Sequence, residues 1–220
     1  MRAVANLGRL DRLARRKLGI LGRRAGRLVT GFDGAGLTLS AHLREAELSL
    51  LTIGLQSFWS NWCRAYYLSC AVGTRTTRGN VVSNSAGITS FNEAMAKAIQ
   101  ITRGSKVPPN AWRPHEEPKW FDPNVLLLIA KGAALTNEPH IAAILGTIPL
   151  TFSHLRTMRN YFAHRGEDLR RDALSISPFY LYGRPDNPSN ILVHIETGRT
   201  RCVVERWTID LERIARALCT

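Results

Sequence analysis

The feature that most constrains this fold is a long run of residues at helical spacing between about Ser40 and Val72. Ser40 is suited to cap the amino end of a helix, and Gly73 is suited to stop it. The positions on one face recur every three or four residues: Leu43, Glu47, Leu50, Leu51, Leu55, Phe58, Trp62, Ala65 and Tyr66. A helix of this length predicts a mainly α-helical protein.

Further helices are predicted over about 89–102, 124–135 and 139–145, and from an amino-terminal cap at Thr147 to about Arg165. Residues 104–123 hold five of the ten prolines, and we expect a long loop there because proline at this density forbids a helix interior. Toward the carboxyl end of the chain, the spacing of the hydrophobic residues changes. The β-branched runs 191–196 and 201–208, joined by residues 197–200, predict a β-hairpin, with a short closing helix over about 210–218.

Charge is concentrated at the amino end. The chain has 30 Lys and Arg against 17 Asp and Glu, a net charge of +13, which favours a polyanionic partner, nucleic acid first and an anionic membrane second. Residues 1–30 carry nine basic side chains and one acid, Asp11, or +8. Their apolar residues recur at helical spacing and predict a basic amphipathic helix, although an arginine-rich transit peptide has a similar composition: Leu7, Leu10, Ala14, Leu18, Leu21, Ala25 and Leu28.

We therefore divide the chain into a basic arm with a glycine-rich hinge (1–36), a helical domain with a proline-rich loop (37–170), and a hairpin with a closing helix (171–220) packed on the same domain. No apolar run approaches the roughly 20 residues that span a bilayer, so a membrane partner is not expected. The four cysteines form no CxxC motif and no Cys/His ligand pattern. This predicts no metal site and fits a reducing cytoplasm.

The segment from Leu155 to Gly166 carries the most informative pattern. On a helical wheel, Leu155, Met158 and Phe162 form a core stripe, and Asn160 and His164 fall on the opposite side. Arg159 lies about 40° from Leu155, at the edge of the stripe, where an uncompensated guanidinium is costly. Either its side chain extends to solvent or it meets a carboxylate or phosphate. Among acids on predicted helices (Glu45, Glu47 and Glu93), Glu47 is slightly favoured as its partner.

The spacing Arg159-Asn160-x3-His164 resembles the signature of the HEPN superfamily. The surrounding LRxxRNxxAHR is similar to the HEPN ribonucleases of toxin–antitoxin and phage-defence systems. The resemblance implies a helical bundle and a metal-independent endoribonuclease that needs no cofactor and acts on RNA, either tRNA or mRNA. It also implies a homodimer in which two motifs build one cleft, and an antitoxin or defence partner. Some HEPN toxins carry a modified tyrosine two residues after the histidine, where this chain has Gly166, so control by that route is not expected.

Each motif residue has a role under this resemblance. His164 would be the general acid and base, Arg159 would hold the scissile phosphate, and Asn160 would orient His164 or donate to a phosphate oxygen. Further RNA contacts are assigned to four arginines: Arg156, Arg165, Arg75 and Arg78. The alternatives are a non-catalytic RNA- or nucleotide-binding HEPN subunit of a larger complex and, lower, a membrane-surface protein that uses the basic arm.

Overall fold

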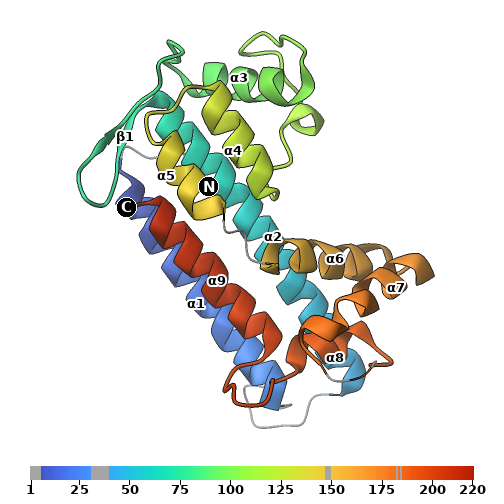
Figure 1. The fold of residues 1–220 in the computed structure, drawn as a ribbon. Coiled ribbons are helices and arrows are strands. Elements are labelled where there is room, and N and C mark those ends of the chain that lie inside the picture. The colour runs from blue at the N-terminus through green and yellow to red at the C-terminus, as the bar shows by residue number, and fades with distance from the viewer. Residues whose placement is uncertain (1–5, 31–39, 147–149, 182, 184) are drawn as a thin grey trace. The chain divides into compact units, whose positions relative to one another are not determined.

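The computed structural model describes residues 6–30, 40–146, 150–181, 183 and 185–220. Over these ranges the protein is mainly α-helical, as predicted (Figure 1). The α-helices are α1 (Leu7–Thr30), α2 (Ala41–Val72), α3 (Phe91–Arg103), α4 (Pro123–Gly132), α5 (Glu138–Leu145), α6 (Thr151–His164), α7 (Glu167–Ser175), α8 (Pro188–Val193) and α9 (Val203–Leu218). The short strands β1 (Thr74–Arg75) and β2 (Val81–Val82) pair antiparallel, with Thr74 opposite Val82.

The chain forms two compact units. The first comprises the described residues of segments 1–14, 58–148 and 213–220, and the second those of segments 15–57 and 149–212. Helices α1, α2 and α9 each contribute residues to both units.

Aromatic side chains of α2 form the core of the first unit. The rings of Trp59, Trp62 and Tyr66 stack in succession, with centroids 5.4 and 5.2 Å apart. The Trp62 indole N–H donates to the carbonyl of Leu10 (3.4 Å) and the Tyr66 hydroxyl to the carbonyl of Leu218 (3.0 Å), which ties both ends of the chain to this helix. Because these rings are buried, they hold the fold together and are not exposed for contact with a ligand.

The ends of the predicted helices have identifiable causes. The Ser40 hydroxyl accepts from the Leu43 N–H (3.2 Å), and Gly73 ends α2 with a φ of 105° that only glycine adopts readily. Ser90 and Glu93 form a reciprocal capping box at the start of α3. The cap predicted at Thr147 lies outside the described residues, as does the hinge at 31–36.

The proline-rich segment is a loop, as predicted, with one short 3-10 turn at Pro114–Glu116. It is held to α2 by the Arg64 guanidinium, which donates two hydrogen bonds to the Glu117 carboxylate (2.8 and 3.1 Å). Trp120 is buried and stacks on Tyr67, with centroids 5.6 Å apart. The loop therefore contributes to the core of the first unit.

The predicted C-terminal hairpin is wrong. The first half of the first run lies in α8, which is capped by the side chain of Asn187 as it accepts from the Ser189 N–H (2.8 Å). The second run lies largely in α9, whose buried residues recur at helical spacing: Val203, Val204, Trp207, Leu211, Ile214, Ala215 and Leu218. Burial of this stripe outweighs the strand preference of single β-branched residues. The strands that the structure describes lie instead in the segment after α2.

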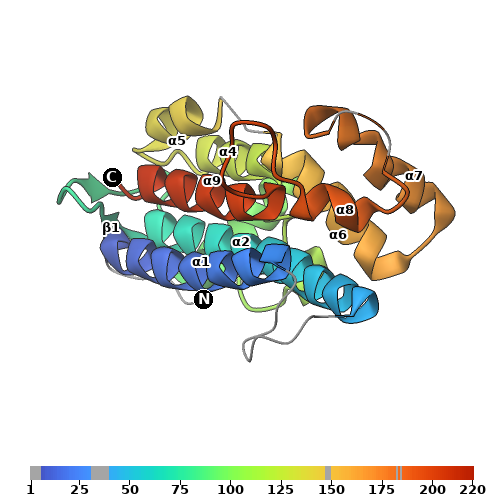
Figure 2. The same ribbon diagram turned by 90° about the horizontal axis from the view of Figure 1, so that it is seen from below.

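The basic amphipathic helix predicted for the first thirty residues is confirmed as α1, but it is not a separate arm. Its apolar stripe from Leu7 to Leu28 is buried. Figures 1 and 2 show α9 running beside α1. In the second unit, Gly22 and Gly26 let the two helices approach closely, because a Cβ at either position would lie 3.1 Å from Thr208 Oγ1 or 3.0 Å from Glu205 Oε1. The helix is therefore part of the packed structure.

Candidate functional site in the second unit

Helix α6 carries the motif, and its buried face fixes the orientation of the exposed one. Leu155, Met158 and Phe162 are buried, as the helical wheel predicts. At the first turn the Thr151 hydroxyl donates to Asp210 of α9 (2.7 Å). After its last turn the chain enters α7, which packs against α6. Contacts at both ends thus hold the helix in place, and they fix the direction in which its polar face points.

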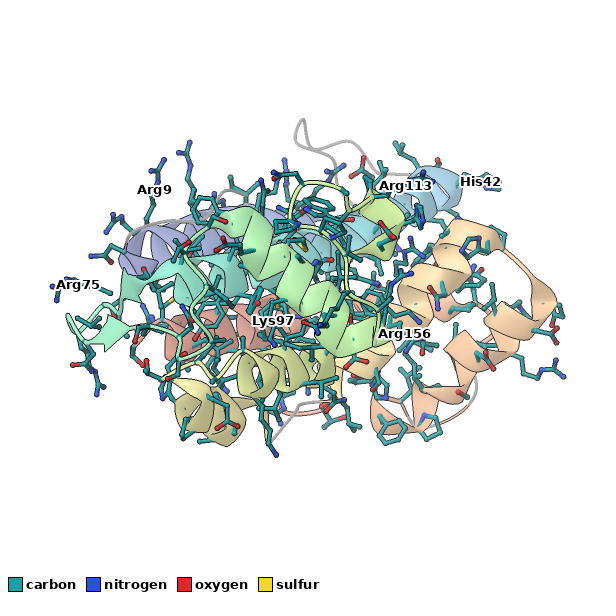
Figure 3. The ribbon with its side chains drawn as sticks, turned by 90° about the horizontal axis from the view of Figure 1, so that it is seen from above. Arg9, His42, Arg75, Lys97, Arg113 and Arg156 are labelled. Atoms are coloured by element: carbon teal, nitrogen blue, oxygen red, sulfur yellow. The ribbon has the colours of Figure 1, made fainter. Side chains whose placement is uncertain are left out.

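The polar face presents a ladder of side chains. Arg156, Asn160 and His164 follow at intervals of four residues, so they lie one above the other on successive turns. Arg156 and His164 are exposed and Asn160 is half-buried. Figure 3 labels Arg156 on this helix. Arg156 is one of the four arginines predicted to contact RNA, and its position in the ladder makes it a candidate phosphate contact next to Asn160.

Arg159 lies at the edge of this face and is half-buried. Its guanidinium donates to the Asn160 side-chain carbonyl over 3.3 Å. Within the described residues it meets no carboxylate, and Asn160 makes no hydrogen bond with His164. Arg159 therefore retains donors for an anion, and the Asn160 side chain contacts the guanidinium rather than the imidazole.

Glu47 is not the partner of Arg159, which corrects that prediction. Its carboxylate accepts from the Nε of Arg24 on α1 (2.6 Å). The other acids considered are also engaged, since Glu45 pairs with Arg165 and Glu93 caps its own helix. The prediction failed because the amino-terminal segment was treated as an arm, whereas its packed helix supplies the arginine that Glu47 binds.

Arg165 has a structural role directly after His164. It ends α6 in the left-handed conformation, with a φ of 52°, and its N–H donates to the carbonyl of Tyr161 (2.9 Å). Its guanidinium contacts Glu45 and lies over the rings of Tyr161 and Phe162, 5.4 and 5.3 Å from their centroids. The group assigned to RNA thus already has three partners in the protein.

Arg75 and Arg78 belong to the first unit, on and beside the β1–β2 hairpin. Both are exposed, and Arg75 donates to the carbonyl of Gly79 (3.1 Å) within the same turn. Figure 3 shows Arg75 pointing away from the ribbon. Their position is compatible with a surface contact but does not define a site.

A buried polar network escaped the sequence analysis. His154 Nδ1 lies 2.7 Å from the Tyr180 hydroxyl, which accepts from the Trp207 indole N–H (3.1 Å). The direction of the hydrogen bond between His154 and Tyr180 depends on which ring nitrogen of His154 carries the proton. Burial lowers the pKa of His154 and raises the pKa of Tyr180. The network supports the start of α6. It was not predicted because the one sign of it, the burial of His154 in α6, is a property of the folded structure.

Metal-ligand groups are not found in the part of the chain that the structure describes: no three His, Cys, Asp or Glu side chains converge. The four cysteines are buried and form no disulfide, and burial raises the pKa of Cys70 to about 12. Nor does any helix within the described ranges have the length and apolar character to cross a membrane.

Comparison with protein-family models, with curated proteins and with solved structures finds no match for this chain.

Proposed function

We propose that this protein is a metal-independent endoribonuclease whose site is built from Arg159, Asn160 and His164 of two copies of the chain. The observation that carries the proposal is the end of α6. There an exposed histidine follows, by five residues, a half-buried arginine that meets no carboxylate in the described part of the chain. The sequence resemblance to HEPN ribonucleases supplies the reaction, and a role as a toxin or phage-defence effector follows from it.

RNA carries its own nucleophile, the 2′-hydroxyl. The protein therefore needs only to transfer protons and to stabilise the charge that develops on the phosphate. The 2′-oxygen attacks the adjacent phosphorus while its proton passes to a histidine, the bond to the 5′-oxygen breaks, and that oxygen takes a proton. The products are a 2′,3′-cyclic phosphate and a 5′-hydroxyl. His164 supplies acid–base catalysis, worth about 10²- to 10⁴-fold, and Arg159 offsets the charge that develops on the phosphate.

The helix geometry favours a shared site. Arg159 and His164 lie about 140° apart around one helix at 100° per residue, so one chain presents them in different directions. In a two-fold dimer the arginine of one copy and the histidine of the other can meet on one phosphate. Arg156, one turn before Asn160, would add a second cation along the RNA backbone.

The test is cleavage of a structured RNA by purified wild type, His164→Ala and Arg159→Ala. We expect both variants to lose at least 10²-fold in rate, and the wild type to leave cyclic-phosphate ends. His42→Ala is the matched control, since His42 is also an exposed histidine in a terminal turn of a helix, and it should retain full activity.

Two further results would decide against the proposal. Equal cleavage by His164→Ala and wild type would exclude this active site. RNA binding without cleavage by any variant would favour the alternative, a non-catalytic RNA- or nucleotide-binding subunit of a larger complex. A substrate with a 2′-deoxy residue at the cut position must resist cleavage if the 2′-hydroxyl is the nucleophile.

A further inference from the structure

The exposed face of α1 carries a row of five arginines, which we call the arginine ridge. All five side chains are exposed: Arg9, Arg12, Arg16, Arg23 and Arg27. At 100° per residue they fall within an arc of about 60°, on the side of the helix opposite the buried leucines. The acid of this helix, Asp11, is buried. The ridge is thus a continuous line of positive charge.

Four of the five ridge arginines are not neutralised by the described part of the protein. Arg9, Arg12, Arg16 and Arg23 pair with no carboxylate in the described ranges, whereas Arg24, outside the arc, is bound to Glu47. Figure 3 shows Arg9 projecting away from the helix. Like charges three and four residues apart on a helix repel each other. A bound polyanion would relieve this repulsion.

The burial of the apolar stripe argues against an anionic lipid surface as the partner of the ridge. A basic amphipathic helix binds a lipid surface by placing its apolar face in the membrane. The apolar face of α1 is used inside the protein, since Leu7, Leu10, Ala14 and Ala25 are at most 1% exposed. Two exposed apolar side chains, Leu13 and Ile20, remain beside the ridge. The ridge therefore offers charge to a partner with little apolar surface.

The composition of the helix also selects the mode of nucleic-acid binding. Helix α1 contains no aromatic residue, so it cannot stack bases, which is how proteins hold single strands without reading their sequence. Arginines can still contact phosphates. From Arg9 to Arg27 the helix rises about 27 Å. A DNA duplex of that length presents about 16 phosphate charges on a stiff scaffold, and an RNA duplex carries a comparable line of charge.

We propose that the arginine ridge binds the sugar–phosphate backbone of a nucleic-acid duplex, without sequence preference; that this duplex is RNA rests on the proposed function. This surface is distinct from the Arg159/His164 site. The proposal does not depend on cleavage, so it survives if the chain proves to be a binding subunit only.

The experiment compares two variants of equal charge in a His164→Ala background, which prevents cleavage. The ridge variant replaces Arg9, Arg12, Arg16 and Arg23 by glutamine, a residue with good helix propensity. The control replaces four exposed cations on other elements by glutamine: Lys106, Lys119, Lys131 and Arg201. Binding of an RNA duplex of about 20 base pairs is measured by fluorescence anisotropy between about 50 and 200 mM salt.

We expect the slope of log K against log salt to become shallower by about 3 to 4 in the ridge variant, about 0.9 per lost phosphate contact, and by less than about 1 in the control. Arg→Lys at the same four positions should retain most of the slope. If the glutamine variant loses helix content by circular dichroism, the double variant Arg16→Gln/Arg23→Gln provides the same test, with an expected change of about 2.

Three outcomes would overturn the proposal. The first is an equal change of slope in the ridge and control variants. The second is a single-stranded RNA of the same length that binds as tightly as the duplex and loses as much in the ridge variant. The third is loss of binding to vesicles of phosphatidylserine and phosphatidylcholine with no loss of duplex binding, which would assign the ridge to a membrane.

Discussion

Arg165 and Glu45 form an ion pair directly beside the last helical residue of the candidate site. Arg165 stands in a left-handed conformation that residues other than glycine, asparagine and aspartate seldom adopt. Its side chain lies over Tyr161 and Phe162, and these contacts offset the conformational cost. This arrangement fixes where α6 ends and hence the turn that presents His164.

The conformation of Arg165 predicts an unusual order of stability among its variants. Arg165→Ala loses the ion pair and the ring contacts but keeps a side chain at φ 52°, whereas Arg165→Gly loses the same contacts and relieves the backbone. We expect the glycine variant to be the more stable by about 1 kcal/mol. Urea unfolding of both proteins measures the difference. An alanine variant as stable as the glycine variant would contradict the argument.

The proposed shared site predicts complementation between inactive proteins. In a mixed dimer of Arg159→Ala and His164→Ala chains, one copy retains the histidine and the other the arginine. If catalysis joins groups from two copies, mixing restores cleavage that neither protein shows alone. Activity is followed on one RNA before and after exchange of subunits. A site complete within each chain would give no rescue, although both parents would still be inactive.

The buried His154 predicts a loss of stability in acid. Burial lowers its pKa from the ordinary value of 6.5, so the unfolded chain binds a proton at a pH where the folded protein does not. The contribution to stability is therefore complete above about pH 6.5 and is lost as the pH falls through the lower pKa of the folded state.

The measurement is the melting temperature at pH 7.5 and pH 5 for wild type and His154→Phe, a variant that fills the same space. Wild type should lose more on acidification than the variant, which has no imidazole to protonate at this position. An equal loss in both proteins would show that another group governs the acid dependence.

Two glycines of α1, Gly19 and Gly22, are expected to respond differently to substitution by alanine. A Cβ at Gly19 has only Arg23 Nη1 nearby, at 3.7 Å, whereas one at Gly22 lies 3.1 Å from Thr208 Oγ1. Gly19→Ala should stabilise the protein by about 0.5 to 1 kcal/mol through helix propensity and reduced freedom of the unfolded chain. Gly22→Ala should gain less, because the Thr208 side chain on α9 must give way. A larger gain at Gly22, by urea unfolding, would contradict this packing.

The helices that could be predicted from the sequence are those whose signals are local. Ser40 and Gly73 bound α2, Ser90 and Glu93 cap α3, and the spacing of Leu155, Met158 and Phe162 sets the buried face of α6. The predicted hairpin failed because Val203 and Val204 were read as strand residues, although with Trp207 and Leu211 they lie on one buried face of α9. In this segment the tertiary contacts, rather than local preference, decide that the residues form a helix.

The same division holds at the candidate site. The positions of Asn160 and His164 on one face follow from a period of 3.6 residues. The pairing of Glu47 with Arg24 could not be predicted, since it depends on how two helices pack together, which no local sequence signal specifies. The left-handed Arg165 has no sequence signal either, because a helix end of this kind usually carries glycine.

Helices α1, α2 and α9 each contribute residues to both units, and this limits which truncated forms of the chain can fold. No single cut separates the units into contiguous fragments, so neither can be expressed by truncation at one end. Deleting residues 1–30 would remove the positive charge and, with it, leucines buried in both units. A truncated protein that fails to bind RNA would therefore say nothing about charge, and only substitutions at the surface of α1 can separate recognition from folding.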